Sequence, residues 1–205
     1  MSKAEKFWDL FARRYSKSAI KDEKSYKKTL DDTKRYLKRK AVVLEIGCGT
    51  GTTALILAGS VNKMTATDIS KNMIAIGKEK AKKQKIKNVN FVQSTLFDKK
   101  LKKGSFDVIL AFNLIHLLKD TEAVMKRINE LLRPNGLFIS KTPCLGESRL
   151  MPILGFFIRM VIGPITCFTV TEFKASITNV KFEIIDTHIY PEKSPRIFVV
   201  ARKKG

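Results

Sequence analysis

Hydrophobic positions follow two different spacings along this chain, and the spacing changes near residue 41. Before that point Ala4, Phe7, Leu10 and Phe11 recur at helical spacing and predict an amphipathic helix over residues 2–16. A lysine-rich segment predicts a second helix over residues 22–39. Beyond residue 41, short apolar runs predict buried strands at 42–46, 64–67, 89–93, 106–112 and 137–141.

Helical segments separate most of these runs. They begin at Thr52, near Ser70, which is a suitable N-cap, and at Thr121. Alternating strands and helices are typical of a parallel sheet with helices on both faces. After Pro143 the pattern changes to a helical stretch at 145–163, a short helix at 171–177 and two strands at 181–188 and 196–201, which predict an antiparallel hairpin.

The expected fold is therefore α/β and doubly wound. Its seven-stranded sheet is mostly parallel, with an antiparallel terminal hairpin and an N-terminal helical cap. We expect a single domain over residues 1–205, because no linker rich in Gly, Ser or Pro divides the chain. Within it we expect a cap (1–40), a core (41–142), a helical lid or substrate segment (143–178) and the terminal strands (179–205).

Composition excludes several classes of protein. A chain of 205 residues that is 44% hydrophobic can bury a core, which excludes a disordered chain and a disulfide miniprotein. Three cysteines without paired spacing favour a reducing compartment and offer no metal-site pattern. Arg159 and nearby prolines interrupt the apolar stretch 150–170, and no signal segment is evident, so we expect a cytoplasmic protein.

The charge is strongly positive. Forty Lys and Arg against nineteen Asp and Glu give a formal net charge of +21. Most of these cations are lysines, which is typical of a solvated surface. Proteins that bind phosphate groups favour arginine instead, because its planar guanidinium can donate two hydrogen bonds to one phosphate. Attraction to an anionic membrane, an acidic partner or nucleic acid stays open as an alternative.

A glycine-rich loop follows the first predicted strand. It reads Glu45-Ile46-Gly47-Cys48-Gly49-Thr50-Gly51, and its glycines allow a sharp turn and a close approach to a ligand. The dinucleotide fingerprint fails because Thr52 stands where its last glycine belongs, and the lysine of a phosphate-binding P-loop is missing. Glu45 before the glycines disfavours phosphate and favours a cation.

An acidic residue ends the second predicted strand. Asp68 stands 21 residues after Gly47, where a carboxylate can accept hydrogen bonds from both hydroxyls of a ribose. Its alternative role is to cap the helix that follows.

These motifs together resemble a class I S-adenosylmethionine-dependent methyltransferase. The resemblance covers about residues 41–142 and rests on the glycine loop, Asp68, the fourth strand (106–110) and the segment 131–136. Phe7-Trp8-Asp9 and Tyr15 resemble the entry helices of the small-molecule branch, including quinone-type methylases. The resemblance implies a Rossmann-like fold and S-adenosylmethionine as cofactor.

The resemblance also implies roles for individual residues. Gly47, Cys48, Gly49 and Gly51 would lie against the methionine part of the cofactor, and Glu45 would order their loop. Asp68 would hold the ribose, and Ile69 would pack on the adenine. Apart from the resemblance, the aromatic face of Tyr15 would attract the sulfonium and close over the cofactor, the alternative being a helix that only docks on the core. Thr95 stands where the family often has Asp, so the Thr95 hydroxyl or the Leu96 N–H would contact the adenine. Asn113 would border the cofactor and the acceptor.

His116 is the candidate catalytic residue. It follows the fourth strand, where the acceptor would lie, and it is a base or an acceptor-orienting group. The alternative is a structural histidine packed at the start of a helix. Thr142-Pro143-Cys144 resembles the nucleophile segment of RNA cytosine methyltransferases, but Asn113-Leu114-Ile115 replaces their second Pro-Cys element. A nucleobase acceptor is therefore disfavoured.

The sequence favours methylation of a small acceptor such as a thiol, a sulfide or an amine. The main alternative is a quinone or phospholipid methyltransferase at a membrane surface, with the apolar residues of 145–168 lining the acceptor pocket. An RNA methyltransferase and a non-catalytic cofactor-binding scaffold are less favoured. The expected partners are a small-molecule acceptor and an anionic membrane in peripheral contact. The oligomeric state is open.

Overall fold

The computed structural model of the chain describes residues 2–20, 22–147, 165–190 and 195–205. The chain forms two compact units, Met1–Asp98 and Lys99–Gly205. Among the described residues there are seven strands, three in the first unit and four in the second. They form the mostly parallel α/β arrangement that the sequence predicts, with two antiparallel strands at its end.

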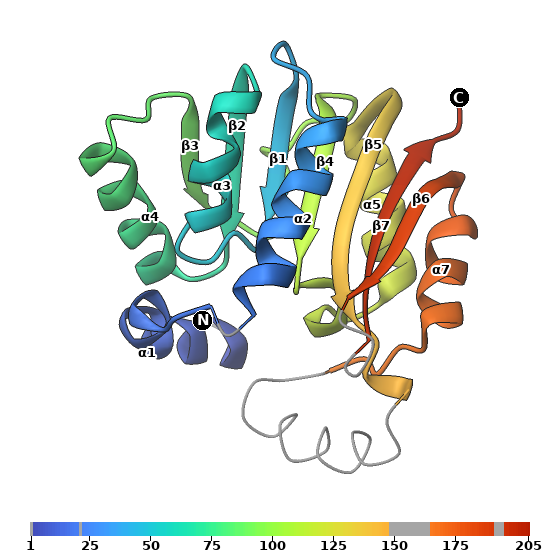
Figure 1. Cartoon of the computed structure of the whole chain (residues 1–205), viewed down its shortest axis with the longest axis horizontal. Helices are drawn as coiled ribbons and strands as arrows, with labels where there is room; N and C mark the ends of the chain where they lie inside the picture. The colour runs from blue at the N-terminus through green and yellow to red at the C-terminus, as the bar shows by residue number, and fades with distance from the viewer. Residues whose placement is uncertain (1, 21, 148–164, 191–194) are drawn as a thin grey trace. The chain divides into compact units, whose positions relative to one another are not determined.

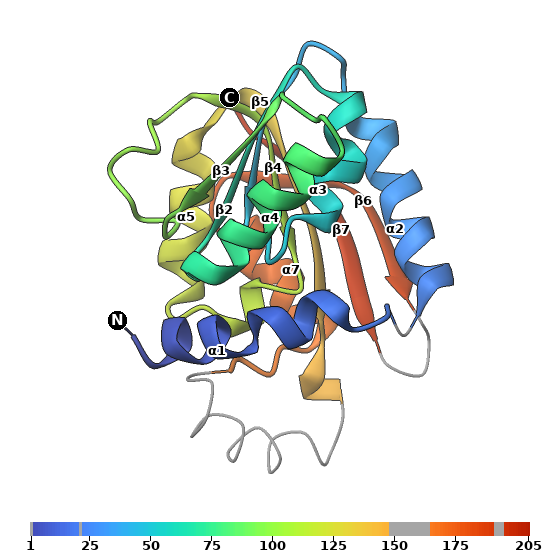
Figure 2. The same ribbon diagram turned by 90° about the vertical axis from the view of Figure 1, so that its left-hand side faces the viewer.

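The first unit carries three parallel strands in the order β3-β2-β1 (Figure 1). Val42 of β1 lies opposite Lys63 of β2, and Met64 lies opposite Val89 of β3. Its elements are α1 (Lys3–Lys17), α2 (Glu23–Tyr36), β1 (Val42–Ile46), α3 (Thr52–Leu57), η1 (Ala58–Ser60), β2 (Lys63–Asp68), α4 (Lys71–Lys83) and β3 (Val89–Gln93). Because the strands are parallel, their carboxyl ends meet at one edge, and Figures 1 and 2 show α1 at that edge.

Short polar side chains cap three helices of this unit, α1, α2 and α4. Ser2 and Glu5 form a capping box at α1, and Asp22 accepts a hydrogen bond from the Ser25 N–H at α2. Ser70 accepts a hydrogen bond from the Met73 N–H, which confirms it as the N-cap of α4. The capped ends place α1 and α4 where the sequence predicts them.

The second unit carries four strands in the order β4-β5-β7-β6. Strands β4 and β5 are parallel, and β7 is antiparallel to both β5 and β6, as expected for the terminal hairpin. Its elements are β4 (Phe106–Phe112), η2 (Ile115–Leu117), α5 (Thr121–Leu131), β5 (Leu132–Pro143), η3 (Leu145–Glu147), α7 (Val170–Thr178), β6 (Phe182–Tyr190) and β7 (Arg196–Lys203).

Two predicted segments of the second unit need comment, the start of β5 and the helix expected at 145–163. Strand β5 begins at Leu132 rather than at 137, because Leu132 already pairs with Phe106 and Leu137 pairs with Val108. Residues 133–136 leave the ladder between these pairs, and Asn135 there has a φ of 60°. Most of the helix expected at 145–163 lies outside the described residues.

The ring of Phe91 fills the space between two glycines of the first unit. Phe91 of β3 is 3% exposed and lies against two glycines, Gly51 of the glycine loop and Gly77 of α4. A Cβ atom on Gly77 would approach the Phe91 ring to 2.7 Å, and one on Gly51 would overlap it. Gly77 therefore stands within a helix because the ring needs its space.

Candidate functional site

The glycine loop joins β1 to α3 through three left-handed residues. Gly47, Gly49 and Gly51 have φ values of 65°, 54° and 74°, which residues with a Cβ rarely adopt. Gly51 is the N-cap of α3 and supplies no side-chain cap. The loop is therefore a tight turn at the carboxyl edge of the unit, as the sequence predicts.

Asp68 fastens this loop to the end of β2. Its Oδ2 accepts a hydrogen bond from the Gly49 N–H at 2.9 Å, and its Oδ1 accepts one from the Ser70 N–H at 2.9 Å. Burial raises the pKa of Asp68 while both N–H donors lower it, and the net direction is upward. The structure thus brings Asp68 and the glycine loop together, as the ribose hypothesis requires.

Glu45 is the second carboxyl group of this edge. Its side chain is 3% exposed, and its Oε2 has no hydrogen-bond partner. Burial, together with the negative charge of Asp68, raises the pKa of Glu45 to about 8. A buried carboxyl without a partner beside a second acidic group is suited to a positively charged ligand, because a cation would stabilise both carboxylates. The site therefore fits the sulfonium and ammonium groups of S-adenosylmethionine.

Two tyrosines lie near these carboxyl groups. Tyr15 is 52% exposed, yet its Cε1 is 3.6 Å from the position of a Cβ on Gly49. Burial, followed by the charges of Asp68 and Glu45, raises the pKa of Tyr15. Tyr26 hydrogen-bonds Thr53 through its hydroxyl at 3.0 Å, and burial raises its pKa as well. Tyr15 lies beside the glycine loop, and its contact with the cofactor stays a prediction. Sequence reasoning missed Tyr26.

Asp9 of α1 forms a second contact that sequence reasoning missed. Its Oδ1 accepts hydrogen bonds from the Ser70 hydroxyl at 2.5 Å and from the Asn72 N–H at 3.0 Å. The Asn72 side chain also donates to the Asp9 carbonyl at 3.0 Å. Asp9 thus lies at the N-terminus of α4, where a negative charge is favoured. No local sequence signal could reveal a contact across 61 residues.

The adenine-side candidates lie at the ends of β2 and β3. The Ser94 N–H donates to the Asp68 carbonyl at 2.9 Å, which holds the two strand ends together. Thr95 is exposed, Leu96 is 7% exposed, and Ile69 is half-buried with its carbonyl accepting from Gln93 Nε2 at 3.1 Å. The three residues therefore share one edge, with the Thr95 side chain open to solvent.

Cys48 and Lys80 support the loop from within the unit. Burial raises the pKa of the Cys48 thiol well above its usual range, so it is a packing residue rather than a nucleophile. Lys80 of α4 donates from Nζ to the hydroxyls of Thr50 and Thr52, each at 3.0 Å. This lysine, also missed by sequence reasoning, ties the start of α3 to α4.

The acceptor-side candidates belong to the second unit. Asn113 follows β4 with a φ of 53°, and its N–H donates to the Lys141 carbonyl at 2.7 Å. The carbonyl of His116 accepts from the Thr166 N–H at 2.8 Å, while its buried Nδ1 has no hydrogen-bond partner. Burial and the positive charge of Arg196 lower the pKa of His116 to about 4. His116 is therefore neutral at pH 7 and a weak base, which favours an orienting role.

Cys144 is unsuited to nucleophilic attack. Its side chain is buried, and burial raises its pKa to about 11, so the thiolate is scarce at neutral pH. This agrees with the sequence argument against a covalent mechanism.

The geometry of the first unit combines a three-glycine turn, an acidic strand end and a buried carboxyl group. Residues 37–199 match the family model described as "Methyltransferase domain". The chain belongs to this family. A demethylmenaquinone methyltransferase of Lactococcus lactis is 35% identical over 97 residues, 46% of this chain and 38% of that protein. One of Staphylococcus aureus is 32% identical over 121 residues, 57% of this chain and 46% of that protein.

Solved methyltransferase-domain structures share the fold. YcgJ of Bacillus subtilis aligns with a TM-score of 0.73 at 16% identity, over 87% of this chain and 99% of that chain. Geranyl diphosphate C-methyltransferase of Streptomyces coelicolor aligns with a TM-score of 0.75 at 12% identity, over 88% and 79%. These low identities show the fold alone. The matched region spans less than half of the length of the two curated relatives.

Within the described part of the chain, every helix is too short or too polar to cross a membrane.

Proposed function

We propose that this methyltransferase-domain protein transfers a methyl group from S-adenosylmethionine to a small acceptor of the thiol, sulfide or amine type. The observation that carries the proposal is the pair Glu45 and Asp68 beside the left-handed glycine loop. Asp68 is fastened to Gly49, and Glu45 has an unpartnered oxygen in a buried position. A cationic group beside Glu45 would stabilise its buried carboxylate, as the sulfonium or ammonium of the cofactor can.

The bound cofactor supplies a methyl group on a positively charged sulfur, which is already activated for displacement. The protein's part is to bind, to orient the acceptor and to exclude water. Asp68 would hold the ribose hydroxyls, and Gly47, Gly49 and Gly51, which have no side chains, would lie against the methionine part of the cofactor. Asn113 and His116 would orient the acceptor, with His116 acting as a neutral hydrogen-bonding group.

A quinone or phospholipid acceptor at a membrane surface is the second candidate. Two observations favour it: several relatives are named demethylmenaquinone or ubiquinone methyltransferases, and the chain has a net charge of +21. We propose a cytoplasmic location in either case, in keeping with the free cysteines at 48, 144 and 167. Any membrane contact would then be peripheral.

The first test measures cofactor binding. D68A should lower the affinity for S-adenosylmethionine by about tenfold or more, because a hydrogen bond to a charged group contributes about 1.5–3 kcal/mol. Titration calorimetry on wild type, D68A and D31A measures it, with D31A as the control because Asp31 lies exposed on α2 of the same unit. Unchanged affinity in D68A would refute the ribose role.

The second test measures turnover. Release of S-adenosylhomocysteine is followed with thiols, sulfide and amines free in buffer, and with a quinol or phospholipids in anionic vesicles. Turnover of the free acceptors supports the first candidate, and turnover with vesicles alone supports the second. H116A should lower kcat with at least one acceptor while leaving cofactor affinity within a few fold; equal losses of both would show a structural role for His116.

A further inference from the structure

Arg196 lies at the start of β7 in the second unit, and within the described ranges of the chain no carboxylate forms an ion pair with it. Strand β7 runs antiparallel to β5, so it begins at the edge where the parallel strands β4 and β5 end. Figure 1 shows this start beside the end of β5. Its first residue is Arg196, which pairs in register with Pro143, the last residue of β5. Ligands of open parallel sheets bind at the carboxyl ends of the strands, and Arg196 begins β7 at this edge.

A backbone hydrogen bond places the start of β7 beside the strand end next to the candidate acceptor residues. The Cys144 N–H donates to the carbonyl of Pro195 at 2.8 Å, which ties the start of β7 to the end of β5. The charge of Arg196 acts on His116, whose own turn follows β4. Asn113 is bonded to Lys141 of β5 in the same region. The ends of β4 and β5 and the start of β7 therefore converge on His116 and Arg196.

Arg196 has no acidic partner in the described part of the chain. The ion pairs of the second unit join other residues, namely Lys103, Lys126 and Arg127 with glutamates, and Arg133 and His188 with aspartates. Arg196 is only partly exposed, so its guanidinium is partly removed from water without gaining a carboxylate. An incompletely solvated cation of this kind gains most from an anionic ligand.

A second cationic residue, Lys141, lies near the same strand ends. Lys141 is 5% exposed, and its Nζ lies 5.3 Å from the centroid of the Tyr190 ring. Tyr190 pairs in register with Arg196 across the hairpin. Both cationic residues therefore neighbour Tyr190, Lys141 through its Nζ and Arg196 through the strand register.

We propose that Arg196 binds a carboxylate of the acceptor and that the enzyme selects acidic acceptors over their neutral analogues. The planar guanidinium can donate two parallel hydrogen bonds to a carboxylate, which fixes the orientation of the acceptor as well as its charge. This inference rests on the proposed methyl transfer and narrows its substrate class. It adds Arg196 to the acceptor residues, a position for which the sequence offered no signal.

The test uses the protein loaded with S-adenosylhomocysteine, so that binding is measured without turnover. Titration calorimetry compares 2-mercaptobenzoate with its methyl ester, which differ in the carboxylate alone. Wild type should bind the acid about tenfold more tightly than the ester. R196Q should lose this preference while binding the ester as wild type does, and R196K should retain part of it because it keeps the charge.

R202Q is the matched control, because Arg202 lies exposed near the other end of the same strand. It should bind both compounds as wild type does, and thermal unfolding verifies that all variants are folded. Equal affinities for acid and ester in wild type, or a preference that survives in R196Q, would overturn the proposal. Failure of the proposed function gives a different result: either the protein binds no S-adenosylhomocysteine at the start of the titration, or it methylates no acceptor when S-adenosylmethionine takes its place.

Discussion

Glu45 links the charge of the ligand to the protonation of the protein. Its folded-state pKa of about 8 means that the free protein holds this carboxyl mostly protonated at pH 7. A bound cation would favour the carboxylate, so cofactor binding should release about one proton at pH 7 and almost none at pH 9. Calorimetry in phosphate and in Tris, which have different ionisation enthalpies, measures the released proton.

E45Q is the control for this prediction, because it should release no proton from this site. The same pKa also predicts the pH dependence of stability. Between the unfolded pKa, 4.5, and about 8 the folded state keeps a proton that the unfolded state has lost, so the free energy of unfolding should fall as the pH rises. Urea denaturation that shows no difference in this slope between wild type and E45Q would contradict the assignment.

At the same scale, local sequence patterns identified the residues that depend on local conformation. The glycine loop, Asp68 and the Ser70 cap follow from strand ends and turn chemistry, and the structure brings them together. Local patterns did not predict the roles of four other residues, Asp9, Tyr26, Lys80 and Arg196. The first three meet their partners across 27 to 61 residues, and the charge of Arg196 acts on a histidine elsewhere in the chain, so no short-range spacing carries information about them.

At the scale of the elements, the packing of α4 against β3 depends on Gly77, which leaves room for the Phe91 ring. G77A should improve helix propensity by about 1 kcal/mol, yet it would push a methyl group into the Phe91 ring. Overpacking of this kind costs about 1–3 kcal/mol, so we expect net destabilisation. Urea denaturation measures the change in the free energy of unfolding.

G59A provides the comparison, because a Cβ on Gly59 meets nothing within 4 Å. It should leave stability nearly unchanged, whereas the double variant G77A/F91L should recover part of the loss. A stable G77A single variant would show that Phe91 can move aside.

The strands and helices were largely predictable because hydrophobic spacing reports burial directly. The start of β5 was the exception. Pro134, Asn135 and Gly136 predict a turn before the strand, but Leu132 already pairs with β4, and the three residues form an irregularity inside β5. A bulge that interrupts a strand and a turn that precedes one look alike in sequence, since both place the same residues outside the ladder.

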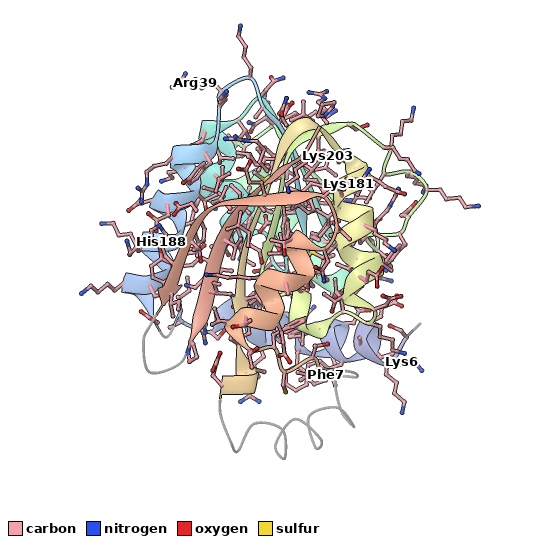
Figure 3. All side chains as sticks on the ribbon, turned by 90° about the vertical axis from the view of Figure 1, so that its right-hand side faces the viewer. Lys6, Phe7, Arg39, Lys181, His188 and Lys203 are labelled. Atoms are coloured by element: carbon pink, nitrogen blue, oxygen red, sulfur yellow. The ribbon has the colours of Figure 1, made fainter. Side chains whose placement is uncertain are left out.

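For the molecule as a whole, the charge of +21 predicts attraction to anionic surfaces. Figure 3 shows Lys6 and Arg39 at opposite ends of the first unit, both extending from the ribbon. Co-sedimentation with anionic vesicles should be strong at low salt and should fall steeply as the Debye length shortens to about 8 Å at physiological ionic strength. Neutral vesicles are the control. Binding that resists salt would indicate apolar insertion instead.

Ser70 has a consequence for the N-terminal helix, because this one residue serves two carboxylates. Its N–H donates to Asp68, and its hydroxyl donates to Asp9. Any ligand that orders Asp68 therefore also orders the cap on which α1 rests. By thermodynamic reciprocity, occupancy of the ribose position should protect the amides of α1 from hydrogen exchange, and loss of the Asp9 anchor should weaken occupancy by the same factor. The stability of α1 and the affinity for the cofactor would then rise and fall together.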